Sequence, residues 1–374
     1  MTTNILLTDM KHYFLLFILL LVIITIEGCT EELHPETNGT NSPVLNEGEL
    51  TKAVLDLSVN TFAVEAQAET RASIPSNIPE NETSEEKEVH NIWVFQYDAV
   101  TKELLIKPRY YTITDQIMLQ DLPVYLKAGI PSFVYVVTNT GYDNWANDDT
   151  DTSWQKFKNL EQLKKQTLPT AFPLRSIDKV SIPMVGASEE VEVTTGITVT
   201  VPVTRMYAKL KVKVEMLKAE MKLNNVNVRQ IPNICRIETF AGDGNGEPMN
   251  AVPFPDGTTF SSIAFAASDL EKSEDKEWAV FYVPENLQGE IENQGGNKSD
   301  AAPTNALVVD VTTEIGGEKY LYAAYPGGNS LNNFNIQRNQ VYRMTLTITG
   351  EKGQNNPSSN CFVVKPNGFL SFEP

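Results

Sequence analysis

The chain of 374 residues is acidic, with 48 aspartates and glutamates against 30 lysines and arginines and a net charge of −18. Binding to nucleic-acid phosphates needs a basic face, so this charge argues against a nucleic-acid partner. Only three histidines are present, which excludes a histidine-rich metal site. The excess of acidic residues suits a solvated extracellular surface.

The N-terminal stretch resembles the signal peptide of a bacterial lipoprotein. Lys11-His12 precedes the apolar residues 13–26, which have the length of a signal h-region and are too short to span a bilayer comfortably. The stretch ends at Cys29 in a sequence similar to a lipobox, in which the cysteine is lipidated and becomes the mature N-terminus. We therefore expect residues 1–29 to be a lipoprotein signal peptide. Glu27 departs from the usual pattern, and an ordinary signal or anchor helix is the alternative.

About 345 residues remain after Cys29, enough for two domains that each bury a core. Residues 30–49 are rich in polar residues and read as a flexible tether. We expect an N-terminal domain over residues 50–202 and a C-terminal domain over residues 203–374. No cofactor is expected, since the sequence has no phosphate-binding loop and no dinucleotide fingerprint.

Residues 50–64 alternate in the manner of a half-buried strand. One face carries Ala53, Leu55, Leu57, Val59 and Thr61. The polar residues 65–84 that follow hold Arg71 and two prolines, and such a segment is exposed and easily cut.

Apolar and β-branched runs predict further strands in the first half, at residues 92–97 and 133–138 and more weakly at 110–118 and 124–127. One helix is expected over residues 154–165, capped by Ser153, with apolar residues recurring every third position.

Residues 197–215 give the densest strand signal, and Pro202 within them indicates an edge, a bulge or a crossing between two domains. Strands are also expected at residues 190–193, 226–229, 235–240, 279–283, 307–312, 320–325 and 340–348. Short strands separated by turn residues predict an all-β fold of the sandwich type. Arg205 and Lys209 are interpreted as outward-facing strand residues, and Glu285 and Asn286 as the turn that closes a strand.

The chain contains several motifs that together resemble the fimbrillins, the pilus subunits of Bacteroidetes. These motifs are residues 181–184, 205–210, 281–289, 338–350 and 359–366, in that order after the lipobox and Arg71. The third and the last are more similar to accessory or tip members than to the major shaft subunit. In relatives with the last motif more sequence often follows, so the resemblance leaves open whether the chain is truncated at Pro374.

The resemblance implies two tandem transthyretin-like β-sandwich domains, the first with one short helix, and no enzymatic activity. It implies export as an outer-membrane lipoprotein and display in a surface fimbrium. Its partners would be other pilus subunits, with a host or bacterial surface receptor in addition. Assembly would follow cleavage between Arg71 and Ala72 by an arginine-specific protease and insertion of a neighbour's strand. The donor would be residues 361–372 in a shaft subunit, whereas a tip subunit would donate none. Alternatively, residues 50–64 are a permanent edge strand.

The sequence also bears on a calcium site, on a disulfide and on other functions. The acidic loops at residues 149–153 and 243–247 lack the glycine and glutamate that a calcium-binding EF-hand loop requires. Cys235 and Cys361 could pair or remain free, and their spacing does not decide between the two states.

A cell-surface glycan-binding lipoprotein is the first alternative function, and a secreted hydrolase is the second. The glycan binder would use the aromatic residues Tyr142, Trp145 and Trp154, although Trp154 also suits a buried anchor of the helix.

Overall fold

The structure is a computed structural model. It describes residues 50–64, 82–116, 120–141, 153–170, 175–176, 178, 181–238, 250–273, 276–292, 298–328 and 332–348. The expected lipidation site Cys29, the tether and the expected cleavage site Arg71-Ala72 lie outside these ranges. So do Tyr142, Trp145, Cys361 and almost all of the two acidic loops.

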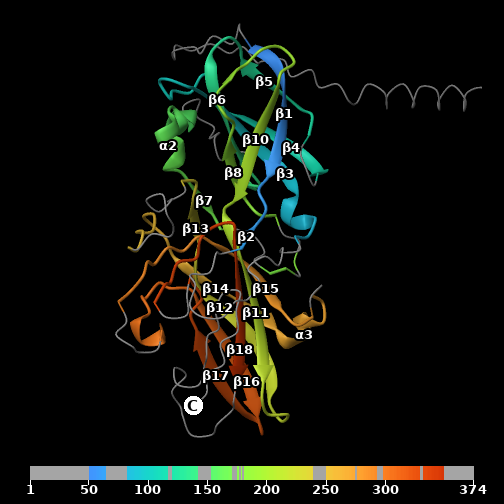
Figure 1. Ribbon diagram of the computed structural model, residues 1–374, viewed down its shortest axis with the longest axis vertical. Helices are drawn as coiled ribbons and strands as arrows, with labels where there is room; N and C mark the ends of the chain where they lie inside the picture. Colours follow the sequence, from blue (N-terminus) through green and yellow to red (C-terminus); the bar gives the residue numbers. More distant parts are fainter. Residues whose placement is uncertain are drawn as a thin grey trace, which may run out of the picture. The chain divides into compact units, whose positions relative to one another are not determined.

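The expected all-β class is confirmed: strands form the described part, joined by a few short helical turns (Figure 1). None of the helices described has both the length and the apolar character needed to cross a bilayer. The first sheet has the order β4-β3-β6-β8-β10-β1-β5, and β9 also pairs with β6. Its strands are β1 (Leu50–Val59), β3 (Val89–Asp98), β4 (Arg109–Gln116), β5 (Leu122–Lys127), β6 (Pro131–Thr138), β8 (Met184–Ala187), β9 (Val191–Glu192) and β10 (Thr198–Arg205).

The second half of the chain, together with β2 from the leading segment, forms two further four-stranded sheets, with the orders β15-β11-β18-β2 and β14-β12-β16-β17. Their strands are β2 (Ala63–Val64), β11 (Tyr207–Met216), β12 (Lys222–Pro232), β14 (Phe260–Ala266), β15 (Ala279–Pro284), β16 (Val308–Ile315), β17 (Glu318–Ala324) and β18 (Gln340–Ile348). The short strands β7 (Thr167–Pro169) and β13 (Ile234–Arg236) pair with each other. β10 leads directly into β11, so the chain changes sheets at Met206, close to the boundary expected at residue 203. Pro202 lies inside β10 and pairs with Ser58 of β1, whereas the pairing of β10 with β8 begins only at Val203.

The leading segment, residues 50–64, takes part in two sheets. β1 lies inside the first sheet, parallel to β10 over Val54–Val59 and antiparallel to β5 over Leu50–Leu55. The interpretation of this segment as an edge strand is therefore wrong. The predicted apolar face is confirmed at Ala53, Leu55 and Leu57, which are buried, but Thr61 is exposed. The segment is two strands rather than one, because after Val59 the chain leaves β1 and enters β2, which pairs with β18.

Two apolar clusters form the core. One fills the first sheet around β1, β5 and β10. The other joins first-half aromatics, including Trp93 and Phe95, with second-half residues such as Leu210 and Val212. Apolar packing thus continues past the sheet change at Met206.

The predicted helix over residues 154–165 is only partly present. A 3-10 turn, η3 (Ser153–Phe157), is followed by a short α-helix, α2 (Leu160–Lys164). Asn159 caps α2, because its side chain accepts a hydrogen bond from the backbone N–H of Gln162 at 2.9 Å. A second helix, α3 (Ala267–Leu270), was not expected.

Candidate functional site

A group of charged and polar side chains lies buried where β10 passes into β11. We call it the Arg205 cluster and define it as Glu82, Glu86, Arg205, Lys209 and Asn339. Arg205 is the last residue of β10, and Lys209 lies in β11. Glu86 belongs to the 3-10 turn η2 (Glu85–Lys87), Glu82 lies just before this turn, and Asn339 immediately precedes β18.

The sequence interpretation of Arg205 and Lys209 as outward-facing residues is wrong. Arg205 is 0% exposed and Lys209 is 4% exposed. By alternation Arg205 lies on the same face of β10 as the buried Val201 and Val203. The carboxylates of Glu82 and Glu86 lie against the two cations on the buried side. A charge run like the one at residues 82–88 usually forms a solvated surface, so this pairing is not apparent from the sequence.

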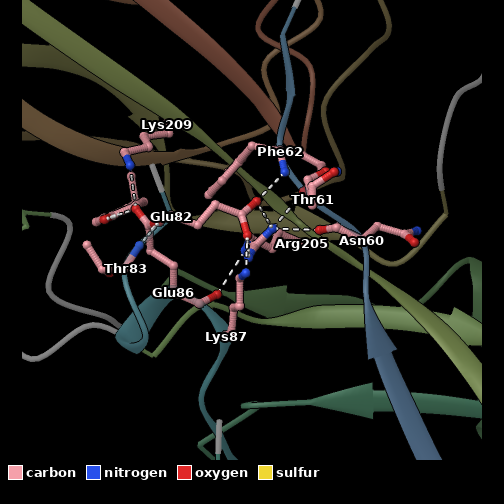
Figure 2. A network of polar contacts seen from close by, with 11 residues as sticks. Asn60, Thr61, Phe62, Glu82, Thr83, Glu86, Lys87, Arg205 and Lys209 are labelled. Carbon is pink, nitrogen blue, oxygen red and sulfur yellow. Dashed lines mark hydrogen bonds and ion pairs between the residues drawn. The ribbon is translucent and has the colours of Figure 1, made fainter. Parts of the chain in front are cut away.

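Arg205 is the centre of the cluster (Figure 2). Its Nε donates to the backbone oxygen of Glu86 at 2.8 Å, and its Nη1 donates to the backbone oxygen of Asn60 at 2.7 Å. Nη1 also donates to Oδ1 of Asn339 at 3.2 Å, and Nη2 lies 3.5 Å from Oε2 of Glu82. The guanidinium carbon is 4.2 Å from the centroid of the Phe62 ring, a cation–π contact.

The cluster holds three consecutive residues of the leading segment through their backbone. Arg205 binds the carbonyl of Asn60, and Nδ2 of Asn339 donates to the carbonyl of Thr61 at 2.8 Å. The N–H of Phe62 donates to Oε1 of Glu82. In addition, the side chain of Asn60 donates to Oγ1 of Thr204 at 2.8 Å. Residues 60–62 are therefore fixed at the point where the leading segment leaves the first sheet.

Glu86 neutralises the second buried cation. Its Oε1 lies 2.8 Å from Nζ of Lys209 and accepts a hydrogen bond from the hydroxyl of Tyr282. Its Oε2 accepts from the N–H of Thr83 at 3.0 Å. Because Glu86 is itself only 1% exposed, these partners are needed to keep a charge in this position.

Burial and pairing act in opposite directions on the charges of the cluster. Burial lowers the pKa of Arg205, and the nearby charges of Glu82 and Glu86 partly offset this. Burial also raises the pKa of Glu82. The hydrogen bonds from Lys87 and Phe62 and the charges of Arg205 and Lys87 outweigh that effect, so the pKa of Glu82 lies below its ordinary value of 4.5.

The lowered pKa of Glu82 predicts a loss of stability in acid. A carboxyl group whose pKa is lower in the folded state stabilises the fold above its unfolded pKa, and this contribution is lost as the pH falls through the folded value. We expect the fall in melting temperature between about pH 6 and about pH 3 to be smaller in Glu82→Gln than in the wild type. Thermal melts at these two pH values measure the difference. An equally large fall in the variant would show that Glu82 does not contribute.

A second buried arginine, Arg338, directly precedes Asn339 in the chain. Arg338 forms an ion pair with Glu285 at 2.8 Å and donates to the backbone oxygens of residues 236, 237 and 238. Glu285 follows β15, as expected for a turn at the end of a strand. It also pairs with Arg338, and Arg338 links the end of β13 to the start of β18. Asn286 is also buried and forms an isolated bridge with Ile336.

Cys235 is a free thiol in the structure, 2% exposed in β13. Burial raises the pKa of Cys235 to about 12, so the thiol is protonated and unreactive at neutral pH.

Trp154 packs against the apolar core, as the buried-anchor interpretation predicts. Within the described residues, no group of three or more His, Cys, Asp or Glu side chains is placed to hold a metal ion.

The chain is similar to one family model and to several solved structures. A family described as a domain of unknown function (DUF4906) matches residues 281–346. No curated protein matches the sequence. Among solved structures, the chain is similar to the tip fimbrial protein Mfa3 from Porphyromonas gingivalis, with C-terminal truncation, at 15% identity and a TM-score of 0.48. This match covers 81% of the present chain and 96% of the other. The chain is thus similar to a fimbrial protein.

Two further structures show the same kind of similarity. One is a fimbrial assembly protein from Parabacteroides distasonis, at 14% identity and a TM-score of 0.44, covering 81% of this chain and 92% of that one. The other is the fimbrial anchor protein Mfa2 from Porphyromonas gingivalis, at 13% identity and a TM-score of 0.39, covering 85% and 98%.

Proposed function

We propose that the chain is a structural subunit of a cell-surface pilus, of the fimbrillin type and in a tip or accessory position, and that it has no enzymatic activity. In this proposal the leading segment is temporary: a strand from another subunit replaces it during assembly. The observation that carries the proposal is the position of β1, which follows the expected lipid anchor and lies inside the first sheet between β10 and β5.

Removal of β1 would leave a groove that only another strand can fill. β5 pairs with β1 and with no other strand among the described residues, and β10 pairs with β8 only over Val203–Arg205. The backbone groups of both strands would lose their partners, and the apolar side chains packed against β1 would become exposed. Strand addition from a neighbour restores both kinds of contact.

The expected cut at Arg71-Ala72 falls between the two parts of the chain that meet at Arg205. Asn60 and Phe62 precede the cut, and Glu82 and Glu86 follow it. Cleavage there would leave Arg205 paired with its carboxylates while freeing residues 50–71 to depart. The charged cluster would therefore remain in place as a receptor for the next strand.

Export as an outer-membrane lipoprotein is part of the proposal, with Cys29 as the lipidated residue. Cells grown with a clickable fatty acid should label the protein, and Cys29→Ala should abolish the label, because the thiol is the attachment point. Cys235→Ala is the matched control and should leave the label intact. Labelling that persists in Cys29→Ala would contradict the lipid anchor.

We also propose that residues 50–202 and 203–374 are separate domains. If so, residues 203–374 expressed alone should unfold in one cooperative thermal transition, because a unit of that length buries enough apolar surface to fold. A gradual, uncooperative melt would instead show that the core shared by the two halves is indispensable.

Immunogold electron microscopy of intact cells tests the proposed function. Label along filaments or at their tips is expected, whereas label spread evenly over the cell body would contradict it. The similar structures of a tip, an assembly and an anchor protein of fimbriae agree with a pilus role. The glycan-binding alternative gains no support from Trp154, which packs in the core.

A further inference from the structure

Removal of β1 would leave β5 without a neighbouring strand among the described residues. The side chains of Val124 and Leu126 on β5 are fully buried in the core of the first sheet. Next to Leu122, however, a polar contact comes from β1 itself, because the N–H of Asp121 donates to Oδ1 of Asp56 at 2.8 Å. That contact leaves with β1. Any polar contact that survives the removal must therefore come from another element.

Gln96 on β3 makes such a contact at the other end of β5. Its side chain is buried, with 0% exposure. Oε1 of Gln96 accepts a hydrogen bond from the backbone N–H of Lys127 at 2.7 Å, and Nε2 donates to the backbone oxygen of Lys127 at 2.9 Å. Nε2 also donates to Oγ of Ser132 on β6 at 2.9 Å. The amide therefore binds Lys127 as a neighbouring strand would, through one donor and one acceptor.

These hydrogen bonds do not depend on β1. In an antiparallel pair, a residue exchanges both of its backbone hydrogen bonds with the residue opposite or exchanges none. Leu50 of β1 lies opposite Lys127, but the N–H of Lys127 is taken by Gln96, so these two residues form a pair without backbone hydrogen bonds. β3 and β6 pair with each other and follow the expected cut in the chain. The contact between Gln96 and Lys127 can therefore persist when β1 departs.

The residue type at position 96 also indicates a specific role. Alternation along β3 places this side chain on the same face as Ile92 and Val94, which are buried in the apolar core of the first sheet. A leucine would suit that face, because burial of an amide is unfavourable unless the amide is hydrogen bonded. The amide of Gln96 meets this condition through the backbone of Lys127 and the hydroxyl of Ser132.

We infer that Gln96 is a positioning residue that keeps β5 in place, as one wall of the groove, while β1 is absent. This inference rests on the proposed function and adds to it the fixed point of the groove. β5 is then restrained at Lys127, whereas its end at Leu122 has lost the contact with Asp56. A replacement strand meets a wall that is already aligned at one end, and this lowers the free-energy cost of its association.

Peptide binding by the cut chain tests this role. The full-length protein is cut by an arginine-specific protease and diluted serially with a trace of a fluorescent peptide of residues 50–71. Because this peptide has the sequence of the resident segment, its fluorescence anisotropy reports the fraction of leading segments that are bound at each concentration. Gln96→Leu should raise the concentration for half-maximal binding about tenfold, since it removes both hydrogen bonds to Lys127.

Asn91→Leu is the matched control. Asn91 is also a buried amide on β3, but its Oδ1 accepts from the N–H of Thr140, which lies outside β1, β5 and β10. Both variants should lower the melting temperature of the uncut chain, whereas only Gln96→Leu should weaken peptide binding. A role confined to general stability would affect peptide binding equally in the two variants.

Ser132→Ala is a milder second variant, for the case in which Gln96→Leu does not fold. It removes the hydroxyl that accepts from Nε2 and leaves Gln96 and Lys127 unchanged. We expect it to raise the concentration for half-maximal binding about threefold, because one hydrogen bond that orients the amide is lost.

The outcomes separate the role of Gln96 from the proposed function. If the cut parent takes up no peptide at any dilution, the leading segment is permanent, and the proposed function fails together with this inference. If the parent takes up the peptide and Gln96→Leu binds it as tightly as Asn91→Leu does, the proposed function stands and the role of Gln96 is overturned. Should Gln96→Leu not fold, unchanged binding by Ser132→Ala would overturn that role in the same way.

Discussion

Replacing Arg205 with methionine should destabilise the uncleaved protein by about 3–5 kcal/mol, the usual effect of removing one member of a buried charged group. Methionine fills much of the same volume but leaves the carbonyls of Asn60 and Glu86 without their donor. It also removes the positive charge that pairs with the carboxylate of Glu82. Denaturant unfolding of the purified precursor measures the effect.

Two further variants make this result specific. Arg205→Lys keeps the charge but cannot reach both carbonyls with a planar fork, so it should recover only part of the stability. Arg175→Met is the surface control. Arg175 pairs with Asp178 and Asp269 but is 27% exposed, and we expect a change of less than about 1 kcal/mol. If Arg205→Met proves as mild as Arg175→Met, the cluster does not hold the leading segment.

The second large effect concerns Leu55, which is fully buried in β1. Leu55→Ala should destabilise the uncleaved precursor by about 2–5 kcal/mol, because it leaves a cavity between β10 and β5. In the assembled form the same change should have no effect on stability, since the proposed cut removes the residue. Thermal unfolding of the precursor and of purified filaments compares the two states.

Leu126→Ala is the matched control for this prediction. Leu126 lies on β5 in the same apolar cluster and is also fully buried, but it remains after cleavage. This variant should therefore destabilise both the precursor and the assembled form. If Leu55→Ala weakened the filaments to the same degree, β1 would be a permanent strand.

Much of the fold follows from local patterns in the sequence. The strand predicted at residues 340–348 coincides with β18, and the apolar face of β1 is correct at three buried positions, because alternation and burial coincide there. β14 was missed, because its two serines and two alanines separate the aromatic and β-branched residues and only Phe265 is fully buried. The interrupted helix reflects Asn159, which favours a cap over a helix interior.

The site was less predictable than the fold. The sequence marks Arg205 and Lys209 as charged residues on a strand, and this pattern normally faces solvent. Their burial depends on Glu82 and Glu86, more than a hundred positions earlier, and on how η2 packs over the strand. No spacing rule links residues so far apart. A useful signal was available in retrospect: apolar residues occupy the intervening positions 206–208, so neither face of the strand suits solvent.

The central claim is that the leading segment is removed before the subunit functions. N-terminal sequencing of the protein recovered from assembled surface filaments tests it most directly. The account predicts a sequence that starts at Ala72. A lipidated chain starting at Cys29 in assembled filaments would contradict it and would instead indicate a permanently anchored subunit.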